Sequence, residues 1–217
     1  MRTVEWNGDH EARRWDARGS VRARPGRFAE LTAFGSQRCA EFEVGWQLTA
    51  GAGALLRSLD IRVVGTVEGQ RLNRTLLLEL TEDRWSCTAW YLDRADLPAP
   101  GVADGGVPLD AVDVVVDSCP LSHLVPLRRL GLATGAGQRG GPVHRAVAGV
   151  PALRVRLPSL AVLPTRQRYH WVADTHGGSR LRHAFAGGEP TDLVIDASGV
   201  PVEFGGLRRV WDTAMAA

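Results

Sequence analysis

The sequence predicts an all-β protein with the architecture of a sandwich, barrel or roll, and three observations support this. Apolar and polar residues alternate through much of the 217-residue chain, which is typical of half-buried strands. Prolines separate the alternating segments, as expected for strand ends and edges. No long segment repeats its apolar residues with the 3.6-residue period of a helix, so we expect many short strands without intervening helices.

The alternation is clearest in residues 40–46, where Phe42, Val44 and Trp46 would share one face of a strand. Arginines alternate with apolar residues in the same way in residues 153–157. A turn with glycine at Asp196–Gly199 separates two apolar stretches, 193–195 and 200–204. This arrangement predicts a β-hairpin.

The remaining alternating segments complete the predicted set of strands. They are residues 57–67, 73–80, 84–92, 110–117, 160–163 and 166–173. The polar, arginine-rich stretch 11–18 is a candidate for a short helix. We detect no domain boundary, so residues 1–217 are expected to form one domain.

Two stretches rich in glycine and proline, 94–108 and 133–149, are long for loops in a compact domain. Such loops are either mobile connections or functional segments. We expect 133–149 to be a flexible glycine-rich loop or an insertion.

Composition excludes several classes of protein. The net charge of +2 gives no electrostatic reason to expect a nucleic-acid partner. The apolar runs are much shorter than the roughly 20 residues of a membrane-spanning helix, and the first residues lack the apolar region of a secretory signal. The three cysteines, Cys39, Cys87 and Cys119, form no metal-binding pair and suit a reducing cytoplasm.

Enzyme motifs are incomplete or missing. Residues 135–140 match the glycine pattern of dinucleotide-binding loops, but neither the helix nor the acidic residue that should follow is present. The nucleophile motif GxSxG and the zinc motif HExxH do not occur. Six scattered histidines could still assemble with a serine or cysteine in space. We therefore expect no cofactor, no metal and no catalytic residue, and lean against an enzyme.

The segment 109–117 is a candidate for a strand that lines a binding site. As a strand it would place Val112, Val114 and Val116 on one face and Asp113 and Asp117 on the other. These carboxylates either face solvent or line a half-polar interior cavity. In a cavity they would need a charged partner.

Arg128 and Arg129 are candidates for that partner. If they lie on a strand, one of them points inward and the other outward.

Tryptophans are numerous for a chain with only two tyrosines. They are Trp6, Trp15, Trp46, Trp85, Trp90, Trp171 and Trp211. They belong either to an ordinary core or to a surface where flat apolar area meets a lipid or sugar. Trp46, Trp90 and Trp171 fall on predicted strand faces.

Three segments of the C-terminal half resemble the bacterial family known as the putative glycolipid-binding proteins. Residues 109–130 are similar to the family's Leu-Asp strand that precedes an Arg-Arg-Leu stretch. Residues 156–169 are similar to its Arg-Phe-Pro-Glu-Leu and Gln-Arg-Tyr motifs, and residues 193–211 to its closing strands. The chain departs from the family at Ser122-His123, where Asn-Thr is usual, and a site shaped by that pair would differ here.

The resemblance implies a single curled antiparallel sheet that forms a spiral β-roll or a partly open barrel. It also implies non-covalent binding of a lipid or glycolipid-like ligand, in an apolar groove inside the roll. The expected ligand-binding residues are Asp113, Asp117, Arg128, Arg129, Arg166, Tyr169 and Trp171. Two alternatives stay open: an enzyme that uses Asp113 and Asp117 as an acid–base pair, and a scaffold for protein interactions.

Overall fold

The computed structural model describes residues 1–24, 30–81, 84–102, 110–132 and 146–213. Most of the glycine-rich segment 133–149 therefore lies outside the described residues, as do residues 103–108 of the other long loop. Residues 146–149 begin a strand.

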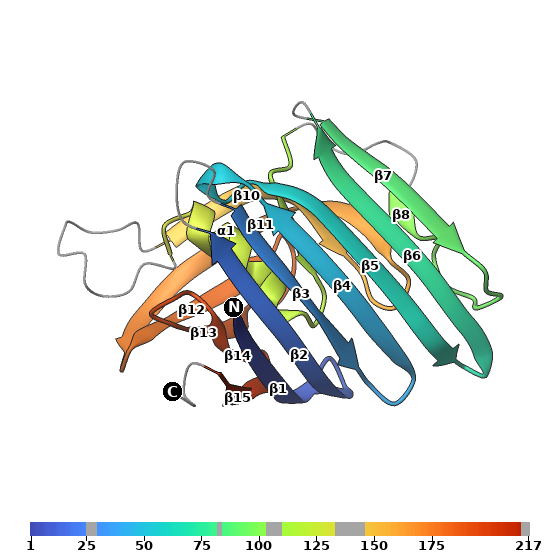
Figure 1. The fold of residues 1–217 in the computed structure, drawn as a ribbon, viewed down its shortest axis with the longest axis horizontal. Helices are drawn as coiled ribbons and strands as arrows, with labels where there is room; N and C mark the ends of the chain where they lie inside the picture. The colour runs from blue at the N-terminus through green and yellow to red at the C-terminus, as the bar shows by residue number, and fades with distance from the viewer. Residues whose placement is uncertain (25–29, 82–83, 103–109, 133–145, 214–217) are drawn as a thin grey trace.

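One 15-stranded sheet makes up most of the described structure (Figure 1). Its N-terminal strands are β1 (Arg2–His10), β2 (Arg13–Arg24), β3 (Glu30–Arg38), β4 (Phe42–Ala50), β5 (Leu56–Val67), β6 (Gln70–Thr81) and β7 (Arg84–Tyr91). The others are β8 (Gly101–Val102), β9 (Asp113–Val116), β10 (Ala146–Val155), β11 (Ala161–Thr175), β12 (Gly178–Phe185), β13 (Thr191–Asp196), β14 (Pro201–Phe204) and β15 (Leu207–Asp212). Three short helical segments join them: η1 (Ala52–Ala54), η2 (Pro120–His123) and α1 (Leu124–Arg129).

The strands follow one another in space in the order β7-β6-β5-β4-β3-β2-β1-β15-β14-β13-β12-β11-β10-β9, with β8 beside β11. The first and last strands pair, for example at Val4 and Asp212, so the two halves of the chain form one continuous curl. Neighbours are antiparallel except for β9 with β10 and β8 with β11. The prediction of an all-β curled sheet is confirmed.

Side chains of the chain itself fill the inside of the curl. Leu121, Leu124 and Leu127 of the η2–α1 segment are fully buried among the inward side chains of the sheet. Gly19, which pairs with Gly35, leaves room for Leu121. A Cβ atom on Gly19 would collide with the Leu121 side chain.

The hairpin predicted at residues 193–204 is confirmed, because β13 and β14 pair from Leu193 with Phe204. The helix predicted at 11–18 is wrong, since Arg13–Arg24 form strand β2. Its inward residues Trp15 and Ala17 are buried, whereas Asp16 and Arg18 are exposed. The abundance of charge on the outward face hides the two-residue period.

Two other predicted elements differ from the structure. The expected strands 160–163 and 166–173 are one strand, β11, which continues through the exposed Pro164. The strand expected to carry Arg128 and Arg129 is instead helix α1. Residues 124–127 are all buried, so alternation is lost, and Pro126 lies in the first turn, where a missing N–H is tolerated.

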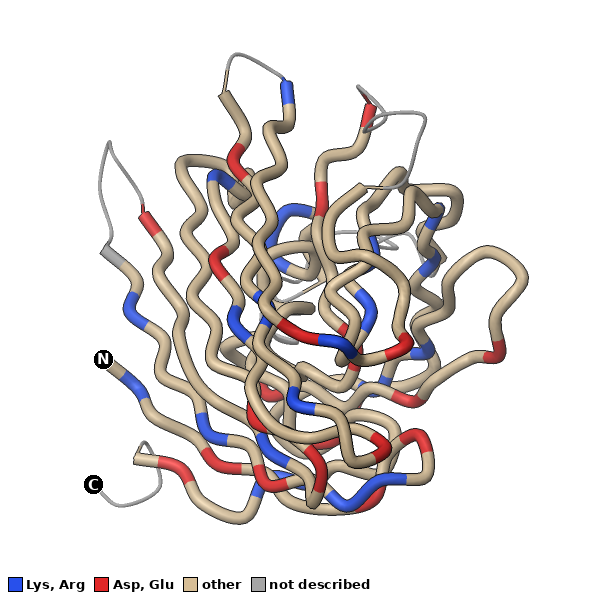
Figure 2. Tube along the Cα trace, turned by 90° about the vertical axis from the view of Figure 1, so that its right-hand side faces the viewer, with Lys and Arg blue, Asp and Glu red and all other residues tan. Residues whose placement is uncertain are grey.

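Charged residues of both signs are interspersed along the strands (Figure 2). At the seam between the chain ends, Arg2 bridges Asp196 and Asp212, and Arg209 contacts the same two carboxylates. Among the described residues, no helix is long and apolar enough to cross a membrane.

Candidate functional site

A chain of polar side chains crosses the interior, and it contains three of the predicted site residues. Arg129 donates from Nε to Oδ1 of Asp113 over 3.0 Å and from Nη2 to Oδ2 over 2.6 Å. Gln167 donates from Nε2 to the same Oδ2 over 2.7 Å. The fully buried Asp113 carboxylate is thus paired through three hydrogen bonds, as a buried charge requires.

The same chain continues to a buried histidine. The Tyr169 hydroxyl donates to Oε1 of Gln167 over 3.2 Å, and Nδ1 of His123 lies 3.0 Å from the Tyr169 oxygen. Because the tyrosine proton is already donated, His123 must donate from Nδ1, which leaves its Nε2 as the unprotonated nitrogen. Burial raises the pKa of Tyr169 well above its usual value and lowers that of His123 well below it.

The second predicted carboxylate, Asp117, belongs to a separate cluster. Its partners are Arg154, at 2.6 Å, and Arg156, at 3.1 Å, and neither was among the predicted site residues. Burial raises the pKa of Asp117, and hydrogen bonding and charge attraction from Arg154 oppose this shift. Asp113 and Asp117 therefore have different arginine partners and do not form an acid–base pair joined by hydrogen bonds.

The remaining predicted residues lie apart from both clusters. Arg128 is half-buried, and burial lowers its pKa. Arg166 is exposed, donates to the Gly149 carbonyl over 2.8 Å and lies 3.6 Å from Asp110. Trp171 packs against the core. The seven predicted residues do not line one common groove, and the inside of the roll is occupied by η2 and α1.

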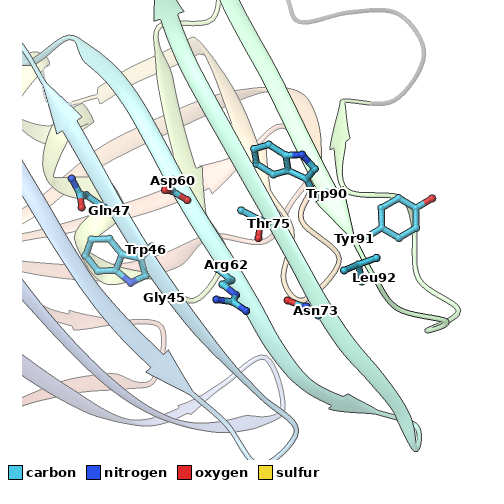
Figure 3. Close-up of a pocket in the computed structure, with 10 residues that line it drawn as sticks. All are labelled: Gly45, Trp46, Gln47, Asp60, Arg62, Asn73, Thr75, Trp90, Tyr91 and Leu92. Carbon is cyan, nitrogen blue, oxygen red and sulfur yellow. The ribbon is translucent and has the colours of Figure 1, made fainter.

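A groove of about 530 Å³ lies on the outer face of β4–β7 (Figure 3). We call it the outer groove and define it by its lining residues, which are Gly45, Trp46, Gln47, Asp60, Arg62, Asn73, Thr75, Trp90, Tyr91 and Leu92. The outward direction follows from alternation along the strands: Asp60 and Arg62 are exposed, whereas Leu59, Ile61 and Val63 are buried.

One row of directly paired residues crosses the outer groove from strand to strand. Gly45 on β4 pairs with Arg62 on β5, Arg62 pairs with Thr75 on β6, and Thr75 pairs with Trp90 on β7. Directly paired residues point to the same face of a sheet. Gly45 leaves open space in this row, because no atom lies within 4 Å of the position its Cβ would take.

The polar side chains of the outer groove are available to a ligand. Within the described part of the chain, Gln47, Asp60, Arg62 and Thr75 make no side-chain hydrogen bond or ion pair. Beside them the apolar surface is well exposed, at 55% for Trp90, 54% for Tyr91 and 81% for Leu92. The groove thus combines free donors and acceptors with an aromatic edge.

The sequence contained one signal for this groove. Trp90 falls on a predicted strand face, where an aromatic residue serves either a core or a ligand surface. The pairing that aligns Gly45, Arg62 and Thr75 with it depends on strand register, which one sequence does not supply. Among the described residues, no three His, Cys, Asp or Glu side chains converge to hold a metal ion.

Comparison with known proteins agrees with the fold. A DUF1089 family protein from Pseudomonas aeruginosa, known from its crystal structure, is similar to the chain with a TM-score of 0.54 and 19% sequence identity. The similarity covers 86% of this chain and 88% of that one. No curated protein matches the chain.

The family whose sequence model matches the chain is described as "Putative glycolipid-binding", and the match extends over residues 4–209. These limits include every strand and leave out only the first residues of β1 and the last residues of β15. The protein therefore belongs to the putative glycolipid-binding family.

Proposed function

We propose that the protein binds an amphipathic, glycolipid-like ligand non-covalently and that the outer groove is the binding site. The observation that carries this proposal is the meeting of unpartnered polar side chains, Asp60 and Arg62, with the exposed Trp90. Ligand sites typically pair aromatic or apolar area with a few polar groups that fix orientation. The family description supports the class of ligand.

The buried residues support binding over catalysis. Asp113 is fully enclosed and held by Arg129 and Gln167, and Asp117 is held by two arginines. The lining of the outer groove contains one carboxylate, Asp60, whereas most glycosidases act through a pair. We assign the interior clusters to the stability of the roll and the groove to the ligand.

We also place this activity in the cytoplasm. Cys39, Cys87 and Cys119 are all free thiols, which suits a reducing compartment.

Flotation with lipid vesicles tests the proposal. The protein is expected to float with phosphatidylcholine vesicles that contain a galactolipid and to stay behind with phosphatidylcholine alone. Trp90→Ala should lower the affinity for the galactolipid vesicles at least about tenfold, because it removes a large aromatic contact worth about 1.4 kcal/mol or more.

Trp211→Ala is the matched control, since Trp211 is also exposed, at 41%, but lies on β15. Equal flotation with both kinds of vesicle would overturn the proposed function. Equal losses in the two variants would remove the outer groove as the site.

A further inference from the structure

The inside of the roll, where a lipid carrier would hold an acyl chain, is occupied by protein. Leu121, Leu124 and Leu127 take this space, and each is fully buried. They pack in the same cluster as the inward residues Ile61 and Leu76, which are also fully buried. The η2–α1 segment therefore fills the apolar interior that the curl of the sheet creates.

The outer groove, in contrast, is shallow and largely polar where it crosses β4–β6. The row from Gly45 to Trp90 spans four strands, or roughly 14 Å at the usual spacing between strands. This length suits a short oligosaccharide. The well-exposed apolar part is at the β7 end, at Trp90, Tyr91 and Leu92, whereas Trp46 at the β4 end is buried.

The polar groups of the groove match sugar hydroxyls, which both donate and accept hydrogen bonds. Asp60 only accepts, Arg62 only donates, and Gln47 and Thr75 can do both. The flat face of the Trp90 indole provides apolar area for the C–H face of a sugar ring.

Charge in the groove favours a neutral head group. Asp60 and Arg62 have opposite charges and are the charged residues of the lining. A phosphate or other anion would be better served by clustered arginines, and here a carboxylate lies beside the single guanidinium.

We propose that the outer groove recognises the neutral sugar head of a glycolipid and leaves the acyl chains outside the protein. This inference rests on the proposed function and deepens it: the protein binds the sugar head group and does not enclose the acyl chains. The row Gly45–Arg62–Thr75–Trp90 forms the floor of the sugar site, with Asp60 and Gln47 beside it.

Tail dependence of affinity tests the inference. Methyl and n-octyl glycosides of glucose, galactose and mannose are titrated against the protein by NMR, with n-octylphosphocholine as a probe that has a tail but no sugar. We expect at least one methyl glycoside to bind, and its octyl counterpart to bind no more than about tenfold more tightly. A fully buried octyl chain would raise affinity by a factor of about a thousand or more.

Gly45→Val places a side chain in the open space of the groove. Valine suits an exposed strand position, and no neighbouring atom obstructs the added Cβ. We expect Gly45→Val and Trp90→Ala to abolish glycoside binding, and Trp211→Ala to leave it unchanged. Thermal melts of Gly45→Val check that the fold is intact.

Three results would overturn the inference while vesicle flotation still decides the proposed function by itself. The first is an octyl glycoside that binds a hundredfold or more tightly than its methyl counterpart. The second is binding of octylphosphocholine but of no glycoside, or no response to any glycoside. The third is glycoside binding that persists in both groove variants.

Discussion

Arg129 and Arg128 are neighbours on α1 with different environments. Arg129 makes two hydrogen bonds to the fully buried Asp113, whereas Arg128 is half-buried and its pKa is lowered by burial. Loss of one partner of a buried ion pair leaves an uncompensated charge, which typically costs about 3–5 kcal/mol. Removing the Arg128 charge, which burial already disfavours, should lower the free energy of unfolding much less.

We therefore expect Arg129→Met to lower the free energy of unfolding by about 3–5 kcal/mol. Arg128→Met, the matched control on the same helix, should cost less than about 1 kcal/mol. Urea denaturation of both variants measures the difference. Equal losses would mean that the pair with Asp113 does not stabilise the roll.

Histidine burial makes stability depend on pH. Burial lowers the pKa of His183 to about 3, with a contribution from Arg154, and lowers that of His123 well below its usual value. In the unfolded chain both titrate near about 6.5. Below that pH the unfolded state binds more protons than the folded state. The contribution of these histidines to stability is therefore fully present above about pH 6.5 and is lost as the pH falls below it.

Each of these two histidines should cost about 1.4 kcal/mol per pH unit once the pH is below its unfolded pKa. Urea denaturation at about pH 7 and pH 5 measures this loss. Asp117 offsets part of it, because burial raises its pKa and the folded state therefore binds a proton before the unfolded state does. His183→Phe should remove a substantial part of the pH dependence, to which His123 and the half-buried His10, whose pKa burial also lowers, contribute as well. His170→Phe, at an exposed position, should preserve it, and an unchanged slope in His183→Phe would contradict the assignment.

At the scale of elements, two glycines on neighbouring strands have opposite surroundings. A Cβ on Gly35 of β3 would collide with the Arg18 carbonyl oxygen and lie 2.8 Å from the Trp46 ring, whereas one on Gly45 of β4 would meet nothing within 4 Å. Gly35 thus allows the Arg18 backbone and the Trp46 ring to lie close to β3, whereas Gly45 leaves open space in the outer groove.

Gly35→Ala should destabilise the protein by about 1–3 kcal/mol, as overpacking in a filled core does. Gly45→Ala should leave stability unchanged or raise it by up to about 1 kcal/mol, because glycine weakens a strand. Thermal denaturation of the two single variants measures both effects. A tolerated Gly35→Ala would show that the β2 backbone at Arg18 and the Trp46 ring can shift without cost.

At the scale of the whole molecule, the pairing of β1 with β15 joins the ends of the chain. Five directly opposed residue pairs, from Val4 with Asp212 to Gly8 with Leu207, form this antiparallel seam. The ion cluster of Arg2 and Arg209 with Asp196 and Asp212 reinforces it. We infer that residues 1–217 form one domain, because neither half of the sheet completes the curl alone.

Urea unfolding should accordingly follow one transition, with tryptophan fluorescence and far-ultraviolet circular dichroism giving the same midpoint. Arg2→Ala should move that midpoint without splitting the transition, since the seam belongs to the same cooperative unit. Two separate transitions in the parent protein would contradict the single domain.

The order of residues along the chain was sufficient to predict the fold class and most of the strands. Apolar and polar residues alternate regularly in β4, β5 and β6, because one face of each strand is buried and the other is exposed to solvent. The residue order of these strands therefore predicts which side chains are buried. Alternation did not predict the structure of residues 124–127, where all side chains are buried. It also did not predict β2, where charged outward residues obscure the two-residue period of a strand. Local patterns cannot distinguish a buried strand from a buried helix.

The ion-pair partners and the outer groove, in contrast, depend on contacts between residues far apart in the chain. Asp113 is paired with Arg129, 16 residues away, but Asp117 with Arg154, 37 residues away. The outer groove exists because strand register aligns Gly45, Arg62, Thr75 and Trp90 from four strands. Register and the filling of the roll by η2–α1 are long-range properties, whereas alternation reports only whether each residue faces the core or water.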